Sequence, residues 1–475
     1  MQRTQNERLL GHVIIAAMEN VLSGGGSTLT ALTLAEASQL VRAKKVSPVE
    51  LTEACLRRIE QRNPGLNAFI TITADSALAE ARTAEGEIHK GQWRGPLHGI
   101  PIALKDLVDT TGVRTTAASD LFRNRVPAED AEVVGKLKAA GAMFLGKLNL
   151  HEFAYGASSV VGAFGPVRNP LDLEYSAGGS SSGSAAAVAA GLCYAALGTC
   201  TGGSIRQPAS FCGIVGLKPT YGLVSARGVV PLSTSLDHVG SITRTVMDAA
   251  LLLQVLAPDG APDYAAAVAL DPSPLRIGVP RAHFYDSLHP EIEASVDAAL
   301  TVLKKLSANQ HPVEFGVSFD AINNLSNLLT KAEAYAYHRQ YVTETPELYQ
   351  AETLRRIRAG AEIDAETYNA AVRELDEVRR SAVRIFETVD ALVTPTVPVP
   401  PFKIAELLAD PQALRSKEQL TLRNTRAFNV LGWPTISIPC GRTSAGLPIG
   451  LQITGAPGAE ATVLSLAAAY ERVTG

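Results

Sequence analysis

The chain has 475 residues, of which 46% are hydrophobic and 19% are charged, and its formal net charge is −4. This composition is typical of a globular protein with enough apolar side chains for a large core. The slight negative charge excludes the strongly basic surface that nucleic acids or anionic membranes attract, so we expect neither as a direct partner.

The five cysteines are odd in number and widely spaced: Cys55, Cys193, Cys200, Cys212 and Cys440. They form no C-x-x-C pair, so their spacing predicts neither a zinc site nor a disulfide framework. We therefore expect no metal, no cofactor and a reducing, cytoplasmic location.

The first 29 residues are predicted to form an extension. Residues 9–18 are apolar and follow Arg3 and Arg8, which faintly resembles a secretory signal. His12 interrupts the run and Glu19 follows it directly, so a short surface helix is the favoured interpretation. Residues 23–28, SGGGST, have the composition of a flexible linker. No run reaches the roughly 18 apolar residues that a membrane span needs.

Two helix starts are clear at the beginning of the remaining chain, residues 30–475, which we expect to be a single domain. Thr33 to Glu36 and Ser47 to Glu50 both have the capping-box pattern, and Pro48 occupies the first helical position after Ser47. The second helix is predicted to run to about Asn63, with Pro64 ending it.

Helix and strand signals alternate along most of the chain. Strands are predicted at residues 68–73, from Gly99, before Asn149, from Leu275 and from Thr435; helices are predicted from Asp130, at 183–191 and from His289. This alternation predicts an α/β/α sandwich around one large mixed, mainly parallel sheet. Residues 327–387 are charged and helical in pattern, and we expect a helical insertion that either lines a substrate pocket or forms a solvated layer.

Lys105 ends the predicted apolar strand in GPLHGIPIALKD, Gly95 to Asp106. A lysine in that place commonly extends its amine to water. A buried amine would instead have a lowered pKa, and a pKa of roughly 7–8 would make it a competent general base.

The loop SAGGSSSGSAAAVAAG, Ser176 to Gly191, gathers serines before an Ala-rich helix. Serine is a preferred helix cap, which would explain the loop without any chemistry. The pattern G-S-S-S-G also matches the nucleophile elbow G-x-S-x-G with Ser181 at its centre, although no convincing buried strand precedes it.

Ser204 follows Thr201, Gly202 and Gly203 in GTCTGGSIRQPASF. Consecutive glycines allow successive backbone N–H groups to point at one spot, which is the physical form of an oxyanion hole. A histidine base is not at hand, because only His98 lies within these segments, several residues from Lys105. A serine–lysine device needs no histidine.

These segments together resemble the signature of the amidase signature family. The resemblance covers roughly residues 30–475, in the expected order and spacing, and further matches begin at Phe164 (FGPVRNP) and Gly446 (GLPIGLQITG). It implies an amide hydrolase that forms an acyl-enzyme and releases a carboxylate together with ammonia or an amine.

The resemblance also implies roles for individual residues. Ser204 matches the nucleophile, Lys105 the base, and Ser180 the serine after a cis peptide bond that links the two. The N–H groups of Thr201, Gly202, Gly203 and Ser204 match the oxyanion hole. Ser181 matches a supporting hydroxyl, and Arg206 is expected to anchor the turn, with binding of a substrate carboxylate as the alternative.

Two positions depart from the family pattern. The family usually has Asp where this chain has Cys200, and the missing carboxylate is expected to loosen the turn that carries Ser204. The family commonly has Gly where this chain has Ser182, which is tolerable unless that backbone needs a positive φ. Val160 and Val161 stand where relatives often carry polar residues, so an apolar or aryl acyl group is expected if their loop lines the pocket.

Three functions are in competition. The first is a stand-alone amidase acting on a small molecule, with its assembly left open between a monomer and a homodimer. The second is the glutaminase-type component of a glutamyl-tRNA amidotransferase, which shares the family core; AEAYAYHR at Ala332 fits general amidases better. The third is a non-catalytic relative, which intact Lys105, Ser180 and Ser204 argue against.

Overall fold

The computed structural model of the chain describes residues 29–475. The surface helix expected at residues 9–18 and the linker expected at 23–28 lie outside the described residues. Within the described part, no helix is both long enough and apolar enough to cross a membrane.

The strands form two sheets of very different size. Their bounds are β1 Phe69–Ile72, β2 Pro101–Lys105, β3 Met143–Leu148, β4 Arg168–Asn169, β5 Asp172–Ser176, β6 Ala195–Cys200, β7 Val215–Lys218, β8 His238–Thr243, β9 Arg276–Val279, β10 Asn309–Pro312, β11 Ala391–Pro395, β12 Thr435–Arg442 and β13 Pro448–Gly455.

Helices alternate with these strands through most of the chain. Their bounds are α2 Leu34–Arg42, α3 Pro48–Leu66, α4 Ala74–His89, α5 Glu132–Ala139, α6 Ser182–Ala189, α7 Arg206–Cys212, α8 Val246–Leu256, α9 Tyr264–Ala267, α10 Pro290–Leu306, α11 Phe319–His338, α12 Tyr341–Glu344, α13 Ala351–Arg358, α14 Ala365–Ala382, α15 Ile404–Ala409, α16 Pro411–Val430 and α17 Glu460–Thr474.

The larger sheet has eleven strands in the order β1-β3-β2-β6-β8-β7-β12-β13-β11-β9-β10. Parallel pairs lie in two groups, β3-β2-β6 and β11-β9-β10, and the strands between them pair antiparallel. The expected large mixed α/β sheet is confirmed. All eight residues of β13 are buried, and α7, α10 and α17 pack on this strand, as expected for a sheet covered on both faces.

The two predicted capping boxes are present. The side chains of Thr33 and Ser47 accept backbone hydrogen bonds at the starts of α2 and α3, and Glu36 and Glu50 return them. The predicted end of α3 is wrong, because the helix continues through Pro64 to Leu66. Pro64 lies in the last turns of a long helix, where apolar packing of the earlier turns already holds the backbone.

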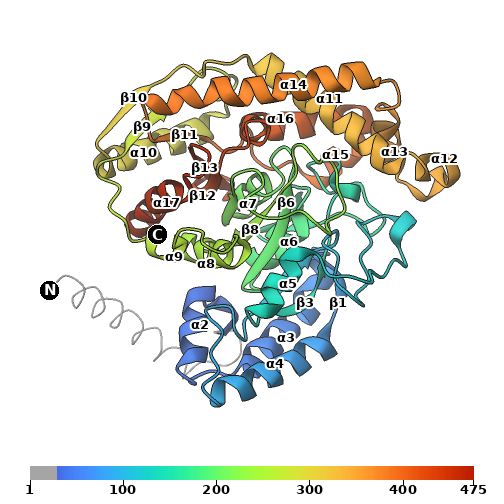
Figure 1. Cartoon of the computed structure of the whole chain (residues 1–475), viewed down its shortest axis with the longest axis vertical. Coiled ribbons are helices and arrows are strands. Elements are labelled where there is room, and N and C mark those ends of the chain that lie inside the picture. The colour runs from blue at the N-terminus through green and yellow to red at the C-terminus, as the bar shows by residue number, and fades with distance from the viewer. Residues whose placement is uncertain (1–28) are drawn as a thin grey trace.

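The segment expected as a helical insertion contains helices and no strand between residues 319 and 387. Its first helix, α11, begins at Phe319, upstream of the predicted boundary at Asn327, with Ser318 as its cap. Helix α11 packs against α13, α14 and α16. In Figure 1 these helices lie together at the opposite end of the molecule from α3 and α4.

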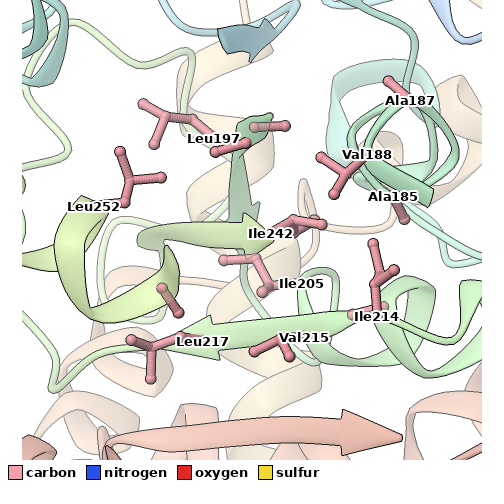
Figure 2. Packing of buried hydrophobic residues seen from close by; sticks show 14 of the residues in the cluster. Ala185, Ala187, Val188, Leu197, Ile205, Ile214, Val215, Leu217, Ile242 and Leu252 are labelled. Carbon is pink, nitrogen blue, oxygen red and sulfur yellow. The ribbon is translucent and has the colours of Figure 1, made fainter. Parts of the chain in front are cut away.

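Helix α6 lies at the centre of the first half of the sheet. It packs against β2, β3, β6 and β8, and its side chains are small, which allows this close approach. Figure 2 shows Val188 of α6 beside Ile242 of β8 and Ile205, all within one buried cluster. Because β6 follows α6 and runs back along it, the start of α6 lies beside the end of β6.

A glycine pair tests this close packing. A Cβ at Gly183 in α6 would lie 2.5 and 2.6 Å from the backbone O and N of Asn149, whereas one at Gly135 in α5 would meet nothing within 4 Å. We expect Gly183→Ala to destabilise the protein by roughly 1–3 kcal/mol through overpacking. Gly135→Ala should stabilise it by about 0.5–1 kcal/mol through helix propensity. Thermal unfolding of both variants measures this, and equal melting temperatures would contradict the packing assigned to α6.

Candidate active site

Neighbouring parallel strands bring Lys105 to the Ser204 segment. Lys105 is the last residue of β2, and β2 pairs in parallel register with β6, whose last residue is Cys200. The carboxyl ends of adjacent parallel strands meet at one edge of the sheet, which is where sites commonly form in α/β folds. Ser204 follows β6 by four residues at this edge.

The Lys105 amine is completely buried and has two hydroxyl neighbours. Its Nζ atom lies 2.8 Å from Ser180 Oγ and 2.8 Å from Thr199 Oγ1. Burial is the largest cause that lowers the pKa of Lys105, to about 7. The amine does not reach water, and a large fraction of it is neutral near neutral pH.

The serine loop before α6 positions its hydroxyls differently. The peptide bond between Gly179 and Ser180 is cis, as the family resemblance implies. Ser181 Oγ donates to the Thr199 carbonyl at 3.1 Å and accepts from the Thr199 N–H at 3.3 Å. Ser181 therefore joins the loop to β6 by its hydroxyl, while Ser180 contacts the lysine.

The nucleophile elbow proposed for Ser181 has little structural basis. The strand before it, β5, belongs to the small β4–β5 sheet and not to the eleven-stranded sheet. Ser181 is fully buried and its hydroxyl is occupied by backbone groups. An elbow serine, by contrast, is exposed at the top of the main sheet.

Ser204 lies in a loop whose backbone donors are unoccupied. The N–H groups of Gly202, Gly203 and Ser204 donate no hydrogen bond to any residue in the described part of the chain. The Ser204 side chain is 5% exposed, and its carbonyl accepts from the Ser181 N–H at 3.2 Å. The structure has no hydrogen bond between the hydroxyls of Ser180 and Ser204; in unliganded sites such contacts often tighten only with substrate.

Two neighbouring elements hold this loop from outside. Thr425 of α16 donates its hydroxyl to the Gly202 carbonyl at 2.7 Å. Thr201 Oγ1 donates to Asp237 at 2.6 Å, and the same carboxylate accepts from the backbone N–H of Leu232 at 2.8 Å. The carbonyl and side chain of the loop are thus engaged elsewhere, which leaves its N–H groups directed to another acceptor.

Arg206 anchors the structure beneath the loop. Its buried guanidinium donates to Asn429 Oδ1 at 2.6 Å, to the Thr425 carbonyl at 2.9 Å and to Gln452 at 3.1 Å. It does not line the cavity that contains Ser204. The anchoring interpretation of Arg206 therefore fits the structure, and substrate binding does not.

Cys200 occupies the place where the family usually has a carboxylate. Its sulfur lies 3.4 Å from Asn429 Oδ1 and 3.8 Å from Arg206 Nη2. Asn429 also donates its amide to the Cys200 carbonyl at 2.7 Å. The neutral Asn429 side chain thus bridges the two residues that a carboxylate at position 200 would join directly, and the turn has a support that the sequence pattern did not reveal.

The second departure, Ser182, is accommodated in the first turn of α6. Its backbone is helical, so it needs none of the positive φ that would call for glycine. Its hydroxyl is buried and unpartnered among residues 29–475.

His238 is the histidine that the sheet brings to this region. Its Nδ1 atom lies 3.3 Å from the Cys200 carbonyl, and burial lowers its pKa well below the usual value. It makes no hydrogen bond to Ser180 or Ser204, so it does not replace Lys105 as their base. In the described residues, no three His, Cys, Asp or Glu side chains are grouped as a metal site.

A cavity of about 50 Å³ contains Ser204. Its lining residues come from the Ser204 loop, α11, α16 and the segments around Tyr155 and Leu232: Ala154, Tyr155, Gly156, Thr201, Gly202, Ser204, Leu232, Ser326, Asn327, Thr330, Lys331, Arg415, Leu422 and Arg426. The helical segment therefore contributes a wall of the pocket through α11.

The expectation of an apolar pocket based on Val160 and Val161 does not hold. Neither valine lines the cavity; both pack with Ile404, Leu407 and Leu414 in a separate apolar cluster. Their apolar character is explained by this contact with α15 and the start of α16, and it carries no information on the acyl group.

Sequence reasoning missed Thr199, Asp237 and Thr425. Thr199 stands directly before Cys200 in the Ser204 segment, and its place on β6 next to Lys105 was a signal that strand pairing could have supplied. Asp237 and Thr425 come from distant segments, and only the folded chain brings them to the loop.

Comparison with known proteins identifies the family. A family model described as Amidase matches residues 50–464. The chain belongs to the amidase signature family. Membership in this family of amide hydrolases and amidotransferases confirms the resemblance and the expected enzyme class.

Individual relatives agree with this family. The A chain of the glutamyl-tRNA(Gln) amidotransferase of Geobacter metallireducens is 40% identical, over 93% of this chain and 97% of the relative. A solved structure described as an amidase is 34% identical, with a TM-score of 0.85 over 94% of this chain and all of that chain. The native peptide amidase of Stenotrophomonas maltophilia is 32% identical, with a TM-score of 0.81 over 93% and 96% of the two chains.

The two loop glycines offer a matched test of the site. Gly203 has a φ of +149°, and an added Cβ would overlap the Thr425 hydroxyl and lie 2.7 Å from Leu422 Cδ2. At Gly202 the nearest atom would be 3.8 Å away. We expect Gly203→Ala to lose most amide hydrolysis, because the displaced loop no longer aligns its N–H groups. Gly202→Ala should retain most of it, and similar rates for both variants would contradict the assigned loop geometry.

Proposed function

We propose that this member of the family hydrolyses a small-molecule amide through a proton relay from Ser204 through Ser180 to Lys105. The observation that carries the proposal is the 2.8 Å contact between Ser180 Oγ and a buried amine whose pKa is lowered to about 7. Burial keeps the amine free of water, so a neutral lone pair is available to a hydroxyl proton.

The first chemical step forms the acyl-enzyme. Neutral Lys105 takes the proton of Ser180, Ser180 takes the proton of Ser204, and Ser204 Oγ attacks the amide carbonyl carbon. Thr199 contributes as a hydrogen-bond partner that fixes the second direction of the amine. The tetrahedral intermediate then expels the amine, which receives the proton back through Ser180.

The second step releases the acid. Water gives a proton to the same relay and attacks the acyl carbonyl, and Ser204 leaves with its proton restored. The products are a carboxylate and ammonia or an amine. The unoccupied N–H groups of Gly202, Gly203 and Ser204 support a role as the oxyanion hole, together with that of Thr201. Each donor of this kind typically stabilises the transition state by about 3–4 kcal/mol.

A second candidate function is that of the glutamine-hydrolysing component of an amidotransferase. It is favoured by the 40% identity to the Geobacter metallireducens relative, which extends along almost the whole chain. Purification of the protein at native expression level discriminates the two. A stand-alone amidase stays a monomer or homodimer, whereas the amidotransferase component co-purifies with a large heterologous partner and prefers glutamine.

The nucleophile can be identified by covalent labelling. A serine-directed fluorophosphonate is expected to label Ser204, because this serine faces the cavity beside free N–H donors. Ser204→Ala should abolish labelling. Ser181→Ala is the matched control, since the Ser181 hydroxyl bonds to Thr199 backbone groups. Peptide mapping that finds the label on Ser181 would overturn the assignment.

The pH dependence tests the base. With the pKa of Lys105 at about 7, the neutral fraction of the amine rises as pH rises through 7. We therefore expect kcat/KM to increase about tenfold per pH unit well below pH 7 and to level off above it. Lys105→Met should lower kcat/KM by on the order of 10²–10⁴-fold, the usual contribution of a general base.

Lys105→Arg provides the control for charge. Arginine keeps a cation at this place but does not deprotonate in proteins, so it should be as inactive as the methionine variant. Circular dichroism should show that both variants fold. An active arginine variant, or a methionine variant with the wild-type pH profile, would mean that another group is the base.

A further inference from the structure

The cavity that contains Ser204 is lined by three basic side chains and by no acidic one among the described residues. Arg415 and Arg426 come from α16, and Lys331 comes from α11. Arg415, Leu422 and Arg426 are spaced by seven and four residues, so they lie on one face of α16. This charge pattern is unusual for a pocket that would bind only neutral groups.

Arg426 is buried without an anionic partner. Its side chain is 8% exposed, and it makes one hydrogen bond, from Nη1 to the neutral Asn323 Oδ1 at 3.0 Å. Burial, with a smaller contribution from the charge of Arg415, lowers the pKa of Arg426 to about 10. The guanidinium stays charged at neutral pH, and a buried charge of this kind is stable only when an opposite charge accompanies it.

Arg415 is likewise unpartnered. It makes no hydrogen bond and no ion pair with any residue in the range 29–475. The nearest candidate on its own helix, Glu418, is already engaged: its carboxylate pairs with Arg356 at 2.7 Å and accepts from the Ser158 hydroxyl at 2.6 Å. Asp237 is held by Thr201 and backbone N–H groups. The protein's own carboxylates therefore leave both arginines available.

We infer that the substrate is a short amide that carries a carboxylate at its other end and no ammonium group beside it, with Arg426 and Arg415 binding the carboxylate. This inference rests on the proposed amide hydrolysis at Ser204. A guanidinium presents parallel N–H donors that match a carboxylate, and two such groups beside the nucleophile would hold the far end while the amide carbonyl meets the loop donors.

The size and charge of the cavity narrow the class further. A volume of about 50 Å³ holds on the order of four water-sized groups, so the substrate chain is short. A zwitterion such as glutamine or asparagine would place an ammonium group in a cavity whose charged lining is entirely basic. Like charges at such range disfavour binding, and the cavity lining offers the ammonium group no carboxylate.

A matched set of amides tests the substrate class. Succinamate carries the carboxylate, butyramide replaces it with a methyl group, and asparagine adds an ammonium group to succinamate. Ammonia release by the wild-type full chain should give a kcat/KM for succinamate at least tenfold above that of either of the others. Equal or higher values for butyramide or asparagine would overturn the inference and leave amide hydrolysis intact.

The arginines are tested by their effect on this preference. Arg426→Gln and Arg415→Gln should each lower the succinamate-to-butyramide ratio by about 10- to 100-fold, the range expected for a lost charge-assisted hydrogen bond. Arg423→Gln is the matched control: it removes an arginine of the same helix that does not line the cavity and bonds to Asn424. An equal fall of the ratio in the Arg423 variant, or no fall in the other two, would overturn the assignment.

Binding without turnover separates the two proposals. Calorimetry with the Ser204→Ala protein should show succinamate binding that Arg426→Gln weakens. If this binding is found but the wild type releases no ammonia from any of the three amides, the carboxylate site stands and the proposed hydrolysis fails. If succinamate does not bind at millimolar concentration, the substrate class is wrong, whatever the turnover.

Discussion

The site depends on the burial of one amine. Lys105 ends a fully buried strand, and its Nζ atom has two hydroxyl oxygens as neighbours and no carboxylate in hydrogen-bond contact. Removal from water disfavours the charged form, and the hydroxyls of Ser180 and Thr199 satisfy the amine without restoring that charge. A carboxylate in either place would keep the lysine protonated, so the neutrality of its partners matters as much as its burial.

The loop that carries Ser204 is likewise held mostly by neutral groups. Its carbonyl groups and side chains bond to α16, to Asp237 and to the loop before α6. Arg206 and Asn429 support it from below through neutral partners. The donors that remain unused are the backbone N–H groups, and they gather next to the hydroxyl that the lysine can activate.

Local signals in the sequence predicted much of this structure, and contacts between distant segments account for the rest. The capping boxes at Thr33 and Ser47 and the strand that ends in Lys105 depend on neighbouring residues, which a sequence displays directly. The end of α3 was predicted wrongly because tertiary packing outweighs the preference of Pro64. The partners Thr425 and Asn429 were not predicted, since they lie more than two hundred positions from the loop they hold.

Helix α16 has two adjacent residues with different duties, and this sets a limit on how the pocket can change. Thr425 holds the Gly202 carbonyl, and the next residue, Arg426, lines the cavity. A replacement at position 426 that rotates or shifts the helix also moves the hydroxyl that fixes the catalytic loop. Divergence toward new substrates would therefore carry a cost in turnover, unless it proceeds through the α11 wall, where Ser326, Asn327 and Thr330 have no such second attachment to the loop.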